Sequence, residues 1–219
     1  MKFIKDLIHA SPYVGVFSTV TEKLALVPRD LPEPKLVQYR DILEVELIPC
    51  SIAGSSLLGV LSAGAQDKIL VSGLATDAEV TRLNDMGVQV LVIPGTHALG
   101  NLLALNDLGG VCSPLFTEQE INRIKSFLGI ELVNMTIGGT ELVGASCRAT
   151  NNGFIVNPHI TAQEFAVLEK IFQVHGMKTT ANYGDRFVSN AVVGNSHGAI
   201  IGMPTTTHEM IRIDDALRK

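Results

Sequence analysis

The chain is long enough for one large domain or two small ones, and its composition excludes several classes of protein. It has 219 residues, of which 46% are apolar and 18% charged, so a buried core is expected and disorder is not. The formal net charge of −5 excludes a general basic surface for nucleic acid, and the N-terminal segment does not resemble a secretion signal. The longest uncharged stretches, 47–66 and 87–106, are interrupted by Pro, Gly and polar residues, which favours buried strands over membrane spans.

The first predicted elements set a pattern that later segments repeat. A strand is predicted near residues 3–8, and a short apolar strand, YVGVFS, follows with Gly15 at its middle. A helix is predicted to begin at Pro32, within LPEPK, because proline is favoured in the first turn of a helix. The strand VELIPC ends this first unit.

The short apolar strand with a small residue at its middle occurs five times. The later copies are LLGVLS, ALGNLL, LVGASC and FVSNAV. The five central residues, separated by 44, 41, 44 and 45 positions, are Gly15, Gly59, Gly100, Gly144 and Ser189. Glycine inside a strand is unfavourable unless another backbone approaches closely, so these residues are expected to line a crowded centre.

Each of the last four units carries a helix-start signal at one fixed distance. Seventeen residues after the central residue stands a Thr that is followed three residues later by a Glu: Thr76/Glu79, Thr117/Glu120, Thr161/Glu164 and Thr206/Glu209. This capping-box pattern precedes apolar positions three or four residues apart, which predict amphipathic helices. Gly87, Gly129 and Gly176 are expected to end three of these helices, and a further strand follows each.

A glycine nine residues after the central residue is the third repeated feature. Gly109, Gly153 and Gly198 lie in NDLGG, NNG and SHG, which are typical of hairpin turns that need a positive φ. The first two units lack this glycine, so their turns are expected to differ.

These signals predict one α/β domain over residues 1–219, made of five strand–strand–helix–strand units of about 44 residues. A unit of this size cannot bury its own apolar face, whereas stacked units can. No unit has the character of a terminal cap, and the N-terminal strand can complete the last unit. We therefore expect a closed ring, a five-fold pseudosymmetric α/β propeller with inner strands around an axis and helices outside.

Residue types that serve catalysis are present without a catalytic arrangement. The three cysteines, Cys50, Cys112 and Cys147, are widely spaced and form no zinc motif, so we expect buried thiols in a reduced, intracellular protein. The six histidines, His97 among them, have no metal-binding spacing, and we expect neither a metal nor a cofactor.

Acidic side chains near the predicted helix starts and ends are interpreted as ordinary surface groups. The pairs Glu118/Glu120 and Asp214/Asp215, and Glu209 beside His208, are expected on solvated helix faces rather than in acid–base pairs.

Several segments resemble the translation initiation factor 6 family in its short archaeal form. They are IPCSIAGSSLLG, HALGNLLALND, TELVGASC with NNGFIVNP, and the closing GMPTTTHE, and the likeness covers essentially the whole chain in order. The resemblance implies the pentein fold and a cytoplasmic protein, monomeric when free, with no membrane association.

The same resemblance implies a partner. A member of this family binds the large ribosomal subunit, chiefly through the L14-family ribosomal protein beside the sarcin–ricin loop, and local contact with rRNA stays open. It blocks joining of the small subunit and takes part in large-subunit maturation, without chemistry or a cofactor.

The resemblance also marks a contact residue. Asn101, in the third unit, matches the family's asparagine at the ribosome contact. Repeat symmetry extends the ribosome-binding ring to Val16, Val60, Ala145 and Asn190. For these four the alternative is a plain strand position beside a core glycine.

Two other functions stay open. The same architecture is found in guanidino-modifying hydrolases and transferases, which use a cysteine near the C-terminus. Here the last cysteine is Cys147 and the fifth unit has none, which disfavours that enzyme class. The third alternative is a scaffold that binds another protein surface.

Overall fold

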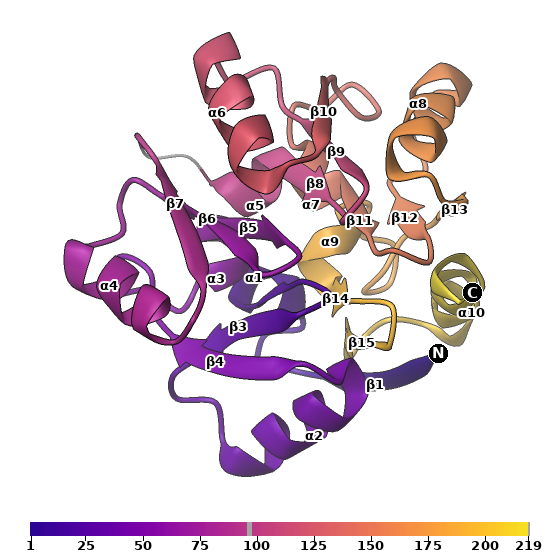
Figure 1. The fold of residues 1–219 in the computed structure, drawn as a ribbon. Helices are drawn as coiled ribbons and strands as arrows, with labels where there is room; N and C mark the ends of the chain where they lie inside the picture. Colours follow the sequence, from indigo (N-terminus) through magenta and orange to yellow (C-terminus); the bar gives the residue numbers. More distant parts are fainter. Residues whose placement is uncertain (96–97, 219) are drawn as a thin grey trace.

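The structure, a computed structural model, consists of five similar units around one centre. It describes residues 1–95 and 98–218, so His97 lies outside the described residues. Each unit contains a one-turn helix, an inner strand, a middle strand and a longer helix, followed by an outer strand. Figure 1 shows the one-turn helices gathered near the middle and the longer helices on the outside.

The elements have similar bounds in every unit. The one-turn helices are α1 (Val14–Phe17), α3 (Leu58–Leu61), α5 (Leu99–Leu102), α7 (Val143–Ser146) and α9 (Val188–Ala191). The inner strands are β2 (Thr19–Val20), β5 (Ser62–Ala65), β8 (Leu103–Leu105), β11 (Cys147–Ala149) and β14 (Val192–Gly194). The middle strands are β3 (Leu24–Pro28), β6 (Lys68–Ser72), β9 (Gly109–Cys112), β12 (Phe154–Val156) and β15 (Gly198–Gly202). The longer helices are α2 (Glu33–Leu43), α4 (Asp77–Asp85), α6 (Glu118–Leu128), α8 (Ala162–Phe172) and α10 (Thr207–Leu217). The outer strands are β4 (Glu46–Cys50), β7 (Gln89–Ile93), β10 (Glu131–Asn134), β13 (Gly176–Lys178) and, for the fifth unit, β1 (Lys2–Asp6).

Each unit forms its own three-stranded sheet. The inner and middle strands pair antiparallel as a hairpin, and the middle and outer strands pair parallel across the longer helix. The fifth sheet takes its outer strand from the other end of the chain, because β1 pairs parallel with β15 from Lys2↔Gly198 to Asp6↔Gly202. The expectation that the N-terminal strand completes the last unit is therefore confirmed.

The hydrophobic core is divided into five clusters, one for each boundary between neighbouring units. In one of them, Val20 and Tyr39 of the first unit pack with Val193 and Ile200 of the fifth. The other clusters join units one and two, two and three, three and four, and four and five. Since the first and last units share a core like every other pair, the units form a closed ring, as the five-fold α/β propeller requires.

The five segments predicted as central strands are one-turn helices instead, and the strand of each unit begins only after them. Short apolar runs do not distinguish a strand from a buried helical turn, which explains this error. The expected crowding is nevertheless present. A Cβ added to Gly59 would overlap the carbonyl oxygen of Gly15, and one added to Gly100 would overlap that of Gly59. Successive one-turn helices thus touch backbone to backbone around the ring.

The helix starts agree with the sequence analysis, and so does the helix-ending role of Gly129, but the role of Gly176 differs. All four Thr/Glu capping boxes are formed, and Gly129 ends α6 in the left-handed conformation. By contrast, α8 ends at Gln173 with a φ of 57°, and Gly176 lies in β13 against the ring of Phe154. Gly176 is therefore needed for packing and not for helix termination.

The hairpin glycines also have a different role from the one predicted. Gly109, Gly153 and Gly198 are absent from the residues with positive φ. A Cβ on each would overlap a backbone carbonyl near the end of the next unit's long helix, those of Ile171, Ala216 and Ile42 respectively. These glycines let adjacent units approach closely, a contact that sequence spacing cannot reveal. The turn of the second unit does differ, since Gln66 there has a φ of 56°.

Candidate functional site

The ring of one-turn helices presents an apolar rim at its surface. The residue just before each helix is Tyr13, Leu57, Leu142 or Phe187 in four of the five units, and we call these four residues the rim. The first three are 40%, 39% and 37% exposed, although all are large apolar side chains. Exposed apolar groups that recur at equivalent positions of a ring indicate a surface that contacts another molecule.

In the fifth unit, Tyr183 extends the apolar surface of the rim. It is 82% exposed and lies in the loop before α9, where its backbone is left-handed with a φ of 65°. Tyrosine is frequent at protein interfaces because it combines apolar area with a polar tip. Neither this residue nor the rim was predicted from the sequence, although the large residue two positions before four of the five central residues was a usable signal.

The five predicted site residues occupy the third position of the one-turn helices, so the structure brings all five onto one ring. Val16, Val60, Asn101 and Asn190 are partly exposed, whereas Ala145 is only 2% exposed. Ala145 can therefore contribute the shape of the surface but little side-chain contact. The amide of Asn101 makes no side-chain hydrogen bond within the described part of the chain, so it is available to a partner.

Capping-box glutamates hold the loops that carry the rim. The carboxylate of Glu79 accepts hydrogen bonds from the backbone N–H of Ala53 and Gly54, each at 2.9 Å, in the loop before α3. Glu209 does the same for Tyr183 and Gly184 at 3.2 and 2.8 Å. Each glutamate thus caps its own helix and fixes one rim loop at the same time. The interpretation of Glu209 as an ordinary surface group is wrong, since it is 5% exposed and its carboxylate accepts backbone hydrogen bonds from Tyr183, Gly184 and Thr206.

These hydrogen bonds favour the ionised carboxylates. Burial raises the pKa of Glu79, but hydrogen bonds from Thr76, Gly54, Ser51 and Ala53 outweigh it and lower the pKa to about 2. For Glu164 and Glu209 burial likewise opposes the hydrogen bonds, and the net direction of the pKa is again downward. At neutral pH the rim loops are therefore held by charged acceptors.

In the first unit a lysine of the longer helix, in place of a glutamate, holds the loop before α1. Lys35 stands where the other helices have glutamate, and its Nζ donates to the Leu7 carbonyl and, at 2.6 Å, to Asp6 Oδ1. The hydroxyl of Tyr39 donates to the other oxygen of Asp6 at 2.7 Å. Burial, followed by the contact with Asp6, raises the pKa of Tyr39, so this hydroxyl stays a donor.

The thiols lack the properties of nucleophiles. All three cysteines are free and buried, as expected. Burial raises the pKa of Cys50 to about 12 and that of Cys112 to about 11, and it also raises the pKa of Cys147. A protonated, buried thiol is a poor nucleophile. Within the described residues, no group of three or more His, Cys, Asp or Glu side chains could hold a metal ion.

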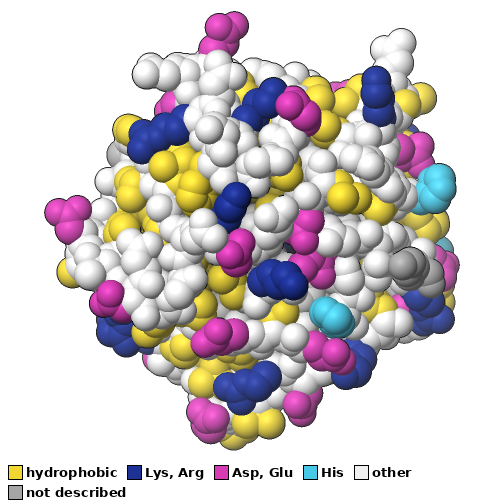
Figure 2. Space-filling model, in the orientation of Figure 1, with side chains coloured by type: hydrophobic (Ala, Val, Ile, Leu, Met, Phe, Trp, Pro, Cys, Tyr) yellow, Lys and Arg dark blue, Asp and Glu magenta, His cyan; other side chains and the backbone are white. Residues whose placement is uncertain are grey.

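The charged surface has no dominant sign on the side seen in Figure 2. Positive and negative side chains are interspersed there, with apolar groups between them. Among the described residues, no helix is long and apolar enough to cross a membrane.

Comparison with known proteins gives consistent relatives. A family model described as the eIF-6 family matches residues 4–216. A protein named translation initiation factor 6 from Thermococcus onnurineus is 36% identical over 214 residues, covering 94% of each chain. Proteins of the same name from Methanospirillum hungatei and Methanocaldococcus jannaschii are each 31% identical, with 95% or more of every chain covered.

A solved structure is also similar in part. It is a cysteine-to-serine mutant of DDAH from Pseudomonas aeruginosa, complexed with citrulline, with 16% sequence identity and a TM-score of 0.45. The match covers 94% of this chain and 72% of the other.

Proposed function

The chain belongs to the eIF-6 family, and we propose that it acts in translation initiation by binding the large ribosomal subunit and preventing the small subunit from joining. The observation that carries the proposal is the rim: large apolar side chains are exposed at equivalent positions around one end of the ring. Held loops make this end a prepared surface, since binding then costs little ordering of the protein.

We infer that the rim and the Asn101 ring form one interface. The exposed tyrosines and leucines supply apolar anchors, and the Asn101 amide supplies a hydrogen-bonding group beside them. Such interfaces derive most of their affinity from a few buried aromatic and apolar anchors surrounded by weaker contacts. Tyr183, as the most exposed aromatic residue, is the strongest candidate anchor.

The proposed contact is chiefly with protein rather than RNA. The net charge of −5 disfavours extensive binding to phosphates, whose affinity depends on Lys and Arg contacts. An L14-family ribosomal protein next to the sarcin–ricin loop is the proposed partner, and the proposed roles include late large-subunit maturation. A cytoplasmic monomer is the proposed free state.

The proposed activity needs no catalysis. The cysteines of this chain are buried with raised pKa values, and the fifth unit contains none. A guanidino-modifying activity would require an accessible thiolate. Turnover of arginine, agmatine or a methylated arginine that a cysteine substitution abolishes would favour the enzyme instead.

Sedimentation with purified ribosomal subunits tests this function. The protein is mixed with large or small subunits of an archaeal ribosome and run through a sucrose gradient at low salt. It is expected to co-migrate with large subunits and not with small ones, and to reduce the joined-ribosome peak when both are present. Protein that stays at the top of the gradient in every mixture would contradict the proposal.

A further inference from the structure

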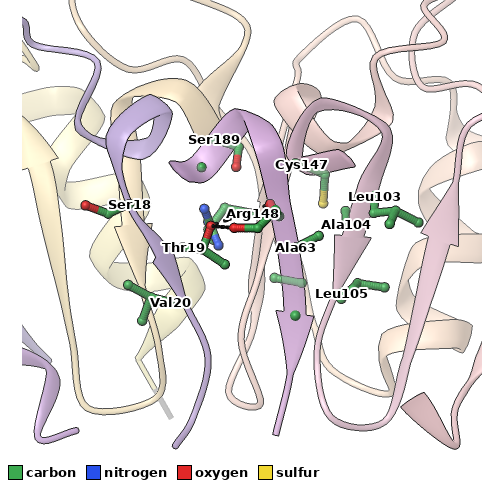
Figure 3. Close-up of a pocket in the computed structure, with 15 residues that line it drawn as sticks. Ser18, Thr19, Val20, Ala63, Leu103, Ala104, Leu105, Cys147, Arg148 and Ser189 are labelled. Carbon is green, nitrogen blue, oxygen red and sulfur yellow. Dashed lines mark hydrogen bonds between the residues drawn. The ribbon is translucent and has the colours of Figure 1, made fainter. Parts of the chain in front are cut away.

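A small cavity lies at the centre of the ring, lined by the inner strands of four units and by residues of the one-turn helices. It has about 30 Å³ of free space, and all five units contribute to its wall. Its lining includes Thr19 of β2, Ser62 of β5 and Arg148 of β11. Figure 3 draws the Arg148 side chain among these residues, with its guanidinium on the side of Thr19, which belongs to a unit not adjacent to its own.

Arg148 brings an unbalanced charge into this cavity. Among the described lining residues it is the one charged side chain, and the wall contains no Asp or Glu. Its Nε is buried without a hydrogen-bond partner, whereas the side chain as a whole is partly exposed, and no ion pair to the guanidinium is found within the described residues. Burial lowers the pKa of Arg148 to about 10, which still leaves it protonated at neutral pH.

The acidic side chains of an adjoining cavity accept hydrogen bonds from backbone N–H groups. Glu22 and Asp107 line a second cavity, at the hairpin end. Glu22 accepts hydrogen bonds from the backbone N–H of Asn151 and Ser196 at 3.1 to 3.2 Å, and Asp107 accepts from Gln66 N–H at 2.8 Å. The guanidinium therefore offers an unpaired N–H donor and a positive charge to a small solute that enters the cavity.

We propose that the central cavity binds a small monatomic anion of halide size against the guanidinium of Arg148. The free space of about 30 Å³ exceeds the roughly 10–15 Å³ that holds one water molecule and is far smaller than a nucleotide needs, so it suits a halide. Each inner strand is the edge of its sheet, so backbone N–H groups without a partner in the sheet face the neighbouring units and can add donors. Thr19 and Ser62, whose hydroxyls lie 2.8 Å apart, supply a polar wall.

Crystals of the unaltered protein grown with sodium bromide test the site directly. Bromide scatters X-rays anomalously, so a bound ion gives a peak that water cannot give. The expected result is an anomalous peak within hydrogen-bonding distance of the Arg148 guanidinium. A channel that contains water density alone at that position would overturn the proposal.

Thermal melting gives a second test in solution. The protein is melted in mixtures of sodium chloride and sodium gluconate at constant ionic strength, since gluconate is too large to enter. Above the dissociation constant, each tenfold rise in chloride is expected to raise the Tm by about 3–5 °C, because a ligand of the native state stabilises it logarithmically.

Matched variants separate this effect from general salt effects. Arg148→Met should lose the chloride dependence and melt at or above the temperature of the unaltered protein in gluconate, because the charge and the unpaired buried Nε–H are gone. Arg123→Met removes an exposed arginine from α6 and should keep the dependence. Equal chloride slopes in the unaltered protein and Arg148→Met would overturn the proposal.

Discussion

At the residue scale, we expect the exposed side chains at the rim and beside it to affect recognition and not stability. Tyr183 illustrates this, because it is 82% exposed while its backbone N–H is fixed by Glu209. Its loss should remove contact with a partner and leave the fold intact. By contrast, replacing the buried glutamates beneath the rim should lower the stability of the fold.

Replacing Tyr183 tests the first half of that distinction. Asparagine is the suitable substitute because it tolerates the left-handed backbone at this position. Tyr183→Asn should weaken binding to large subunits by roughly 2 kcal/mol, about 30-fold, the scale of an interface hot spot, without lowering the Tm. Ile211→Asn, at a 55% exposed residue of the outer helix α10, is the control and should bind normally. Unchanged binding of Tyr183→Asn would remove this residue from the interface.

Acid titration tests the buried glutamates. The pKa of Glu79 is lowered from 4.5 to about 2 in the folded state, so the folded protein takes up this proton only at a lower pH than the unfolded chain does. The stabilisation is therefore complete above about pH 4.5 and is lost as the pH falls toward 2. The downward direction for Glu164 and Glu209 adds to this loss.

Glu79→Gln should flatten part of that acid dependence. At neutral pH it should also lower the free energy of unfolding by about 1.5–3 kcal/mol, the range for hydrogen bonds to a charged group. Glu46→Gln, at an exposed position of β4, is the control and should do neither. Urea unfolding at several pH values measures both effects; identical curves for the two variants would show that Glu79 does not hold the loop.

At the scale of elements, helix starts are the features that the sequence predicts best. The capping box is a local pattern, so the Thr and Glu residues of four units identify four helix starts without knowledge of the rest of the fold. Pro32 precedes α2 in the same way, as its N-cap residue. The one-turn helices were mistaken for strands because four residues carry too little periodicity, and they are stabilised by neighbouring units.

Removing one cap measures its share of the stability. Thr161 Oγ1 accepts from the backbone N–H of Glu164 at 3.2 Å at the start of α8. Thr161→Ala should therefore lower the free energy of unfolding by about 1 kcal/mol, as measured by denaturant titration. Thr161→Ser, which keeps the hydroxyl, should recover most of the loss. An alanine variant as stable as the unaltered protein would mean that the cap contributes nothing.

The contact between one-turn helices gives a larger effect. Gly59→Ala would place a methyl group on the carbonyl oxygen of Gly15, so the two units must separate. We expect a loss of about 3 kcal/mol or more, the upper range for overpacking. Ser189→Ala, at the equivalent position of the fifth unit where a side chain is already accommodated, should cost far less. A small effect of Gly59→Ala, read from the Tm, would contradict the close approach.

At the scale of the whole molecule, the repeat predicts the architecture while contacts between units carry much of the detail. The spacing of Gly15, Gly59, Gly100, Gly144 and Ser189 predicts five units, and the lack of a capping unit together with the N-terminal strand predicts their closure. It could not show that Gly109 meets the backbone of Ile171, or that Arg148 reaches into the centre, because both depend on packing between units. Asn101 became a candidate through a family resemblance. The exposure of the rim could be seen only in the folded ring.

The ring explains why one end of the molecule is suited to binding. The four loops that the structure describes in full there are each tied to the longer helix of their own unit by a buried or half-buried ionic group. The result is a rigid, apolar surface built from segments far apart in the sequence. Such a surface can cover a protein partner while the outer helices stay free.

The most direct test of this account is subunit joining, followed by light scattering as large and small subunits are mixed. The unaltered protein should reduce joining in proportion to its concentration. Asn101→Arg should abolish that effect, because a long charged side chain at the ring obstructs docking, and it should retain the normal Tm. Asn122→Arg, the same change at an exposed position of α6, should inhibit as the unaltered protein does. Joining that the unaltered protein leaves unchanged, or that Asn101→Arg inhibits equally well, would contradict the account.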